Sequence, residues 1–344
     1  MPQARESLNL GVRTWQARVS TSHFLVGLVF LLALPSVVGP QDVSTSDLRQ
    51  VDPYKISVSV ASVILHATVE NQKGAPVSGL SKDDFQVYED GALQPIEYFS
   101  HEDIPVTVGL VLDNSGSMGP KRAEVITAAM AFARSSNPQD QMFVVNFNEH
   151  VSFGLPADTP FTDQTGQLQV ALSKFKTTGE TALYDGLAAA IEHLKMGNRD
   201  KKVLIVVSDG GDNASKCNLS QILAMAGKSD AIIYTVGIYT DEDPDQKPEA
   251  LRELSKATGG EASFPRSVAD VVPLCERIAH DIREQYTLAY APTNRRQDAA
   301  YRVIQVKATA SGHGRLSVRT RTGYYAPSDP QPLAPLAGRQ SNQP

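Results

Sequence analysis

Five oxygen-bearing side chains in the middle of the chain have the types and the spacing to hold a hard divalent cation. Three of them, Asp113, Ser115 and Ser117, lie in the segment DNSGSMG directly after an apolar run. Thr181 follows in TGETALYDGL, and Asp209 follows in VVSDGGDN after a second apolar run. Two carboxylates and three hydroxyls are hard oxygen donors with few formal charges, a set that suits six-coordinate Mg²⁺ or Mn²⁺. Such an ion keeps bound water and leaves one position free for a ligand.

The residue types alone do not distinguish a metal site from a capped turn, because Asp and Ser are also good turn formers. The positions of the surrounding strands and helices distinguish the two. The runs 106–112 (VTVGLVL) and 203–207 (VLIVV) are apolar throughout, which is typical of strands covered on both faces. Asp113 and Asp209 follow these strands, and Thr181 stands at the beginning of a predicted helix. Ligand sites of open parallel sheets lie outside the carboxyl ends of the strands, so the positions together favour a metal site at one sheet edge.

Strands and helices alternate through the whole middle of the chain. Apolar patterns predict strands over 106–112, 143–147, 151–155, 203–207, 231–238 and 261–264, and helices over 121–134, 166–175, 182–195, 219–228, 249–258 and 268–282. This alternation predicts an α/β fold, a doubly wound and mostly parallel sheet with helices on both faces.

The period of the apolar residues changes to two on either side of this α/β unit. Residues 56–69 alternate upstream, and residues 286–290, 302–308 and 315–320 alternate downstream. Each flank has only about fifty residues, a size that rarely supports a separate domain. The flanks are therefore predicted to pair into one antiparallel β-sandwich in which the α/β unit is inserted. Two independent flaps packed on the α/β unit are the alternative, since a single sequence does not show strand pairing.

The N-terminus has the composition of an export signal. Arg5, Arg13 and Arg18 precede an uncharged apolar run over 24–34 (FLVGLVFLLAL). This run would span ~16 Å as a helix, about half of the hydrocarbon thickness of a bilayer, which favours a signal peptide cleaved near Val38. An uncleaved signal-anchor is the alternative, because the run extended to Val38 approaches the lower spanning limit. Either segment predicts an extracytoplasmic protein, secreted or periplasmic.

These patterns divide the chain into six predicted parts. They are a signal peptide or signal-anchor over 1–39, a linker over 40–53, the first part of the β-sandwich over 54–103, the α/β domain over 104–284, the second part of the sandwich over 285–326 and a disordered Pro-rich tail over 327–344. The linker and the tail have little apolar surface to bury.

The composition excludes several classes of partner and cofactor. The net charge is -6, and Lys and Arg are scattered, so nucleic acid is not expected as a partner. The cysteines, Cys217 and Cys275, lack the spacing of zinc ribbons, iron–sulfur clusters or a disulfide scaffold. Whether these two cysteines pair stays open, as does the oligomeric state.

The motifs of the common hydrolases are absent. Aspartyl-phosphate phosphatases also begin with an Asp at a strand end, but they need a second acid two residues later, where this chain has Ser115. A serine-hydrolase elbow needs Gly two residues before the nucleophile, and neither Ser115 nor Ser117 has one. There is no P-loop and no HExxH motif. A non-enzymatic protein is therefore expected, with an aspartyl-nucleophile phosphatase as the less favoured alternative.

At residues 104–284 the chain resembles the von Willebrand factor type A domain, and DNSGS with Thr181 and Asp209 resembles that family's metal-ion-dependent adhesion site (MIDAS). All five positions match the motif. The flanking segments LSKDDFQVYEDGALQPIEYF, REQYTLAYAPTNRRQDAAYRVIQVKA and RTGYY resemble an exported bacterial group of related proteins, so the likeness extends over 54–326.

The resemblance implies a role for each of the five residues. Ser115 and Ser117 would bind the metal directly, and Thr181, Asp113 and Asp209 would bind it directly or through water. An acidic side chain of the ligand would complete the coordination shell.

Two functions follow from this site. The leading hypothesis is an exported binding protein that uses Mg²⁺ to capture an acidic side chain of a protein partner, as in cell adhesion. The alternative is a structural or assembly protein of the cell envelope, whose metal site is architectural and whose β-sandwich makes the contacts. Removal of the metal by EDTA abolishes capture only in the first. No membrane contact is predicted beyond the N-terminal segment, and the identity of the partner stays open.

Overall fold

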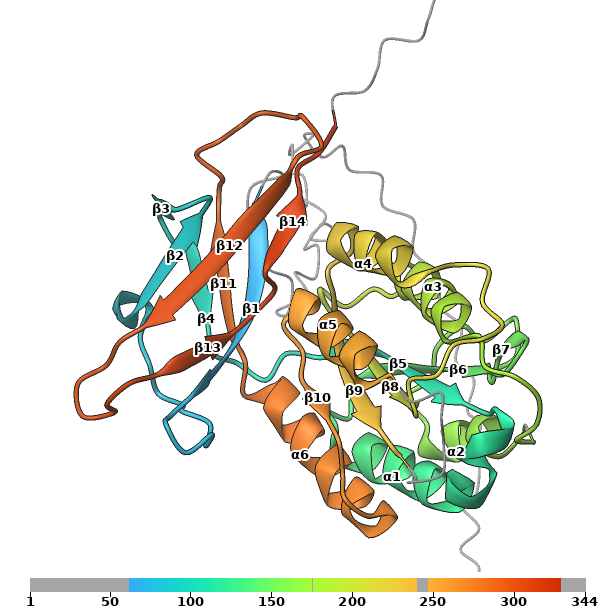
Figure 1. Cartoon of the computed structure of the whole chain (residues 1–344). Helices are drawn as coiled ribbons and strands as arrows, with labels where there is room; N and C mark the ends of the chain where they lie inside the picture. The colour runs from blue at the N-terminus through green and yellow to red at the C-terminus, as the bar shows by residue number, and fades with distance from the viewer. Residues whose placement is uncertain (1–61, 175, 240–246, 329–344) are drawn as a thin grey trace, which may run out of the picture. The chain divides into compact units, whose positions relative to one another are not determined.

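The computed structural model describes residues 62–174, 176–239 and 247–328 (Figure 1). The predicted signal segment, the linker, the strand pattern over 56–61 and the tail beyond residue 328 lie outside these residues. Residues 327 and 328 belong to the fold rather than to the tail, because Ser328 forms a β-bridge with Asp298. Within the described ranges, no helix is long and apolar enough to cross a membrane.

The predicted doubly wound sheet is confirmed. Its strand order is β10-β9-β8-β5-β6-β7, and all neighbours are parallel except β6 and β7, which are antiparallel. Every residue of the strands β5 and β9 is buried, as a continuous apolar pattern predicts for strands covered on both faces. The strands are β5 (Val106–Asp113), β6 (Gln141–Phe147), β7 (Val151–Phe153), β8 (Lys201–Ser208), β9 (Ala231–Gly237) and β10 (Ala262–Ser263).

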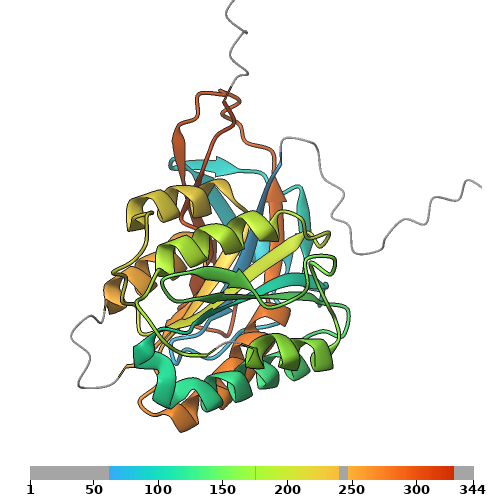
Figure 2. The same cartoon turned by 90° about the vertical axis from the view of Figure 1, so that its right-hand side faces the viewer.

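Helices cover both faces of this sheet (Figures 1 and 2). One layer consists of α1 (Arg122–Ser135), α2 (Thr165–Ser173) and α6 (Val271–Arg283). The other consists of α3 (Leu183–Leu194), α4 (Leu219–Lys228) and α5 (Pro248–Thr258). Short 3₁₀ helices precede α1 and α6, at η2 (Gly116–Lys121) and η3 (Val268–Asp270).

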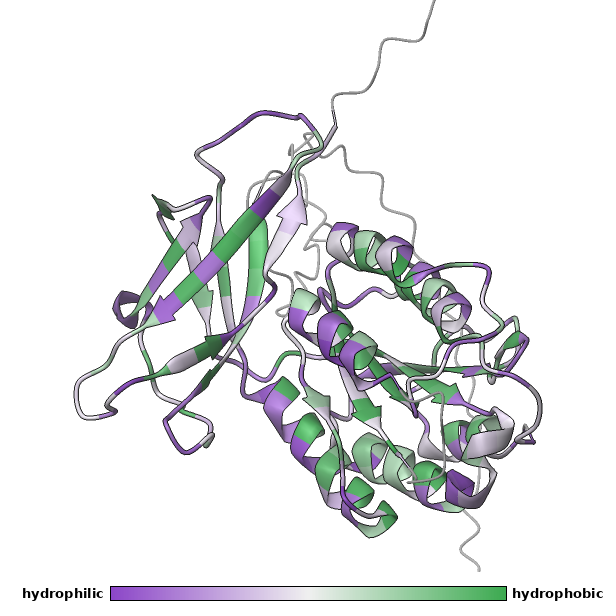
Figure 3. Ribbon diagram, in the orientation of Figure 1, coloured by the Kyte–Doolittle hydropathy of each residue, from purple (hydrophilic) through white to green (hydrophobic). Residues whose placement is uncertain are grey.

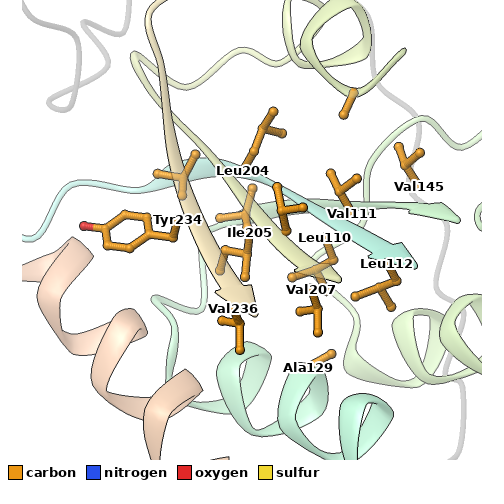
Figure 4. Packing of buried hydrophobic residues seen from close by; sticks show 14 of the residues in the cluster. Leu110, Val111, Leu112, Ala129, Val145, Leu204, Ile205, Val207, Tyr234 and Val236 are labelled. Carbon is orange, nitrogen blue, oxygen red and sulfur yellow. The ribbon is translucent and has the colours of Figure 1, made fainter. Parts of the chain in front are cut away.

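The core of this unit is built from alternate faces of the central strands. Figure 4 shows Val111 and Leu204 on one side of the sheet and Leu112 and Val207 on the other, near Ala129 of α1. All five side chains are buried. Because successive strand residues point to opposite faces, an unbroken apolar run supplies both helix layers with packing surface.

The two flanks pair with each other, as predicted. Upstream strand β1 lies antiparallel to downstream β11, with Val63 opposite Tyr290, and upstream β2 pairs with downstream β12, with Val87 opposite Val306. The alternative of two independent flaps is therefore wrong. The sheets have the orders β13-β1-β11-β4 and β14-β12-β2-β3. The strands are β1 (Val63–Glu70), β2 (Phe85–Glu89), β3 (Ala92–Gln94), β4 (Tyr98–Ser100), β11 (Tyr286–Tyr290), β12 (Tyr301–Ala308), β13 (Ser317–Arg319) and β14 (Gly323–Tyr325), and a 3₁₀ helix, η1 (Lys82–Asp84), precedes β2.

Side chains from both antiparallel sheets form a second buried cluster. It includes Leu65 of β1, Val87 of β2, Tyr286 of β11 and Val306 of β12. Buried and exposed residues alternate along β12, and Figure 3 shows the matching alternation of hydropathy. The Tyr286 hydroxyl donates to the carbonyl of Val77 at 2.9 Å, so the polar end of this buried ring has a partner. The period-two pattern of the flanks thus corresponds to one core shared by both ends of the described chain.

Candidate metal centre

The five residues predicted as ligands lie at the carboxyl-terminal edge of the six-stranded sheet. Asp113 is the last residue of β5, and Asp209 directly follows β8. These two strands are parallel neighbours, with Leu112 opposite Val207, so their ends open at the same edge. Thr181 lies two residues before the start of α3.

A chain of hydrogen bonds joins three of the five side chains. Ser115 Oγ and Ser117 Oγ are 3.1 Å apart, and Ser117 Oγ donates to Asp209 Oδ2 at 2.5 Å. Asp113 lies beside this chain, where its Oδ1 accepts from Ser115 N at 2.8 Å and its Oδ2 accepts from Ser208 Oγ at 2.6 Å. The carboxylate of Asp113 therefore fixes the loop that carries the two serines.

Thr181 completes the wall of a cavity of about 180 Å³. Ser115, Ser117 and Asp209 line the same cavity, so four of the five predicted residues face one space. The backbone N–H of Thr181 donates to Asn213 Oδ1 at 2.8 Å, and its carbonyl accepts from Asn213 N at 3.0 Å. One water occupies about 30 Å³ of liquid, so the cavity has room for an ion that keeps bound water.

The charges of the site fit a divalent cation. Asp113 and Asp209 are 3% and 2% exposed. Burial and the neighbouring carboxylate of Asp209 raise the pKa of Asp113 to about 6, although hydrogen bonds from Ser115 and Ser208 act in the opposite direction. Two carboxylates in a poorly solvated site repel each other, and a divalent cation between them offsets that repulsion.

The donor set depends on the hydroxyl groups. In the parts of the chain that the structure describes, no three His, Cys, Asp or Glu side chains form a group that could hold a metal. The two carboxylates need Ser115, Ser117 and Thr181 to complete a shell of hard oxygen donors. This chemistry suits Mg²⁺ or Mn²⁺ better than a metal that prefers sulfur or imidazole.

Asn114 and Arg122 support the loop that carries Ser115 and Ser117 (the serine loop), and neither was predicted from the sequence. Asn114 is 3% exposed, and its side-chain amide donates to Asn146 Oδ1 at 2.8 Å. Arg122 donates to Asn114 Oδ1 and also to the carbonyl of Leu172 at 3.0 Å. The signal that was available is an Asn inside the motif, next to a buried strand, where a polar side chain requires partners.

Gly179 lies in the turn before Thr181 and connects that turn to the serine loop by a hydrogen bond. The carbonyl of Gly179 accepts from Gly116 N at 3.1 Å. Gly179 has a φ of +81°, and a Cβ there would lie 1.6 Å from Oε2 of Glu149. The same oxygen of Glu149 accepts from Glu180 N at 3.1 Å. Two exposed carboxylates, Glu149 and Glu180, therefore lie at this turn, and Glu180 lines the cavity.

The loop after Asp209 is held by two aspartates that were not predicted from the sequence either. Asp185 of α3 accepts from the backbone N–H groups of Lys216 and Cys217 at 3.0 and 2.9 Å. Asp212 accepts from Ser215 Oγ at 2.5 Å. The bonds to Asp185 fix the loop to the beginning of α3, next to Thr181.

The two cysteines are both free. Cys217 lies in the loop after β8, whereas Cys275 is buried in α6. Burial raises the pKa of the Cys275 thiol to about 12, which makes it an unreactive core residue.

Comparison with known proteins shows which solved structures this chain is similar to. No curated protein matches the chain. Among solved structures, a von Willebrand factor type A protein from Catenulispora acidiphila is 14% identical, with a TM-score of 0.48, and 80% of this chain and 77% of that chain are covered. Proximal thread matrix protein 1 from the mussel byssus, with a zinc occupied MIDAS motif, is 16% identical, with a TM-score of 0.45, and 56% of this chain and 49% of that chain are covered. The pilus adhesin SpaC from Lactobacillus rhamnosus GG is 12% identical, with a TM-score of 0.43 and coverages of 73% and 49%.

The family match covers the part of the chain that carries the site. Residues 108–211 match the family model described as the von Willebrand factor type A domain. This segment begins in β5 and ends at Gly211, two residues after Asp209, so it contains all five predicted ligands. The α/β unit of this chain is therefore a von Willebrand factor type A domain.

Proposed function

We propose that this protein is an exported, non-enzymatic binding protein that captures an acidic side chain of a protein partner through Mg²⁺ or Mn²⁺. The ion would be held by Asp113, Ser115, Ser117, Thr181 and Asp209. The observation that carries the proposal is the row of Ser115 Oγ, Ser117 Oγ and Asp209 Oδ2 along the wall of an open cavity.

The balance of charge in this ligand set favours binding of a carboxylate. Ser115 and Ser117 would contribute neutral oxygens, and the negative charge comes only from Asp113 and Asp209. When bound, the cation supplies an open coordination position at which a partner's carboxylate can bind. A third anionic ligand would give the loaded site a net negative charge, whereas two carboxylates balance the two positive charges of the ion. A further acidic group can then be accepted without strong repulsion.

The residues around the cavity support a binding role rather than catalysis. A serine nucleophile needs a base such as His or Lys to remove its proton. The side chains that line the cavity in the described part of the chain are those of Ser, Thr, Asp, Glu and Asn, with glycines between them. Ser117 instead directs its hydroxyl to Asp209, which suits a ligand that must be held in place.

Export is the second half of the proposal, and it is supported by the charged and apolar pattern of the N-terminus. Arg5, Arg13 and Arg18 precede the uncharged run over 24–34. Mass spectrometry of the mature protein should find its N-terminus near Val38, or an intact Met1 in the membrane fraction if the segment is an anchor.

The test of the binding role uses the full-length protein in two steps. Calorimetry should detect binding of Mg²⁺ or Mn²⁺, and capture of envelope proteins from the same source should disappear in EDTA and return with added Mg²⁺. Thr181→Ala should lower capture more than it lowers metal affinity, because one hydroxyl at the cavity wall is replaceable by water. Capture that persists unchanged in EDTA would favour the structural or assembly role, in which the antiparallel sheets make the contacts.

A further inference from the structure

A second cavity lies at the opposite edge of the six-stranded sheet from the metal centre. It has a volume of about 610 Å³ and is lined by the end of α4, by β14 and by the loop before β12. The helix α4 follows the loop that contains Asp209, and its last residue, Lys228, lies just before the start of β9. Figure 1 shows α4 beside β14, and these two elements are in contact. A cavity of this size is typical of sites for small organic ligands.

Arg302 lines this cavity, and its guanidinium occupies two carbonyl oxygens of the loop before β12 that could otherwise accept hydrogen bonds. Its side chain is 2% exposed and pairs with Glu89. The same guanidinium donates to the carbonyls of Asn294 and Arg296, each at 2.7 Å. The loop before β12 is therefore tied back on itself, and these two carbonyls are already satisfied.

Arg321 also lines the cavity and covers two further carbonyls. It donates to the carbonyls of Gly227 and Ser229 at 3.0 and 3.2 Å. It also pairs with Asp230 at 3.2 Å. Asp230 is the acidic residue among those that line the cavity, so its charge is matched by Arg321.

Three further cations line the cavity without an acid to neutralise them. Lys228, Arg295 and Arg296 are exposed, and none forms an ion pair within the described residues. The ammonium of Lys228 lies 5.6 Å from the ring centroid of Tyr325, which also lines the cavity. A ligand in this cavity therefore meets positive charge and free N–H donors next to an aromatic surface.

We propose that this cavity binds a small organic phosphate whose ring or apolar body packs against Tyr325. A phosphate monoester carries close to two negative charges near pH 7, which matches a cluster of three cations better than a single carboxylate does. Arg295 and Arg296 can hold phosphate oxygens in the forked geometry of a guanidinium, and Lys228 adds a point charge. The proposal does not depend on the metal centre, because the two sites share no residue.

The proposal is tested by calorimetry of the full-length protein with phenyl phosphate in the presence of EDTA. We expect binding with a Kd of about 1 mM or tighter, weakened by added salt. The variant Arg295→Ala/Arg296→Ala should lose about tenfold or more in affinity, since charged hydrogen bonds are removed. Arg266→Ala, an exposed arginine that does not line the cavity, is the matched control and should bind phenyl phosphate like the original protein.

Two further probes separate the parts of the ligand. Inorganic phosphate should bind more weakly than phenyl phosphate, and Tyr325→Ala should remove that difference. Benzoate, with one negative charge, should also bind more weakly. Any one of three outcomes would overturn the proposal. Inorganic phosphate could bind as tightly as phenyl phosphate, benzoate could bind as tightly as phenyl phosphate, or the double arginine variant could bind phenyl phosphate as tightly as the original protein. Loss of phenyl phosphate binding with intact Mg²⁺ binding would leave the proposed function of the metal centre untouched.

Discussion

Ser117 donates a hydrogen bond of 2.5 Å to Oδ2 of Asp209, 92 positions further along the chain. The bond connects the loop after β5 to the loop after β8, two strands that are parallel neighbours in the sheet. A hydroxyl bonded to a carboxylate at this distance is a strong, charge-assisted contact. The relative position of the predicted ligands therefore depends on the register between these two strands.

The aspartates should contribute more to metal affinity than the serines. Asp113→Ala removes a charge and the acceptor for two hydrogen bonds, whereas Ser115→Ala removes one neutral oxygen that water can replace. We expect Mg²⁺ affinity to fall by about 10–100-fold in Asp113→Ala and in Asp209→Ala, and by less in Ser115→Ala, measured by calorimetry. Asp163→Asn changes an exposed acid elsewhere and serves as the control. Unchanged affinity in both aspartate variants would mean that these residues only cap turns.

Gly179→Ala should disturb the site through two effects. Its φ of +81° is strained for alanine, and the added methyl would collide with Glu149. We expect the free energy of unfolding to fall by about 1–3 kcal/mol, and Mg²⁺ affinity to fall with it, because Gly179 holds the serine loop. Gly74→Ala is the matched control, since Gly74 has a φ of +73° and open space around it.

The collision in Gly179→Ala can be tested separately from the strain. The double variant Gly179→Ala/Glu149→Ala should recover part of the lost stability in urea denaturation, because the carboxylate no longer occupies the space of the methyl group. No recovery would show that backbone strain alone explains the loss.

The buried pair of Arg302 and Glu89 should be sensitive to the loss of one partner. Both side chains are 2% exposed, and Glu89 also accepts from the hydroxyls of Tyr290 and Tyr324. Arg302→Met leaves a buried carboxylate without its counter-charge, and we expect a loss of about 3–5 kcal/mol in the free energy of unfolding.

An exposed pair provides the comparison for Arg302. Arg252 and Glu249 are 55% and 82% exposed, so Arg252→Met should cost less than about 1 kcal/mol. The double variant Arg302→Met/Glu89→Gln should be more stable than Arg302→Met alone. Equal effects of Arg302→Met and Arg252→Met in urea denaturation would contradict this account of the buried pair.

Lys201 should make stability depend on pH. It is 3% exposed, and burial lowers its pKa to about 7, although Asp281 and Asp103 favour the charged form. In the unfolded chain the pKa of this side chain is about 10.4. Between about pH 7 and pH 10 the unfolded chain therefore binds more protons than the folded chain, and stability rises with pH across this window.

The variant Lys201→Met isolates this contribution. Relative to the variant, the original protein should gain up to about 1.4 kcal/mol of unfolding free energy per pH unit between about pH 7 and pH 10. Urea denaturation of both proteins at several pH values measures the difference. Parallel pH profiles would show that Lys201 titrates normally in the folded state.

The division into domains predicts which fragments fold. We propose that residues 104–284 fold alone, because the buried cluster of the six-stranded sheet and its helices is separate from that of the antiparallel sheets. Residues 54–103 should not, because β1 and β2 bond to strands from the other flank. A cooperative unfolding transition of the upstream flank by itself, seen by circular dichroism, would contradict the shared sandwich.

The sequence alone was sufficient for the local features of this protein. Apolar runs predicted β5 and β8, helical spacing predicted α4 over Leu219–Lys228, and period two predicted β1, β11, β12 and β13 in the flanks. These features depend on neighbouring residues, because the spacing of apolar side chains along one element reflects which of its positions are buried. The chemical types of Asp113, Ser115, Ser117, Thr181 and Asp209 also sufficed to suggest a hard cation.

Only the tertiary structure decided how these elements meet. The partners of Val63 and Val87 lie more than two hundred residues away, at Tyr290 and Val306, and many downstream strands could have supplied similar pairs. The contact of Glu149 with Gly179, and the use of Arg302 and Arg321 to cover loop carbonyls, have no signature in the sequence. The physical reason is that strand register and long-range hydrogen bonds depend on which surfaces pack together, whereas periodicity reports only whether a residue is buried.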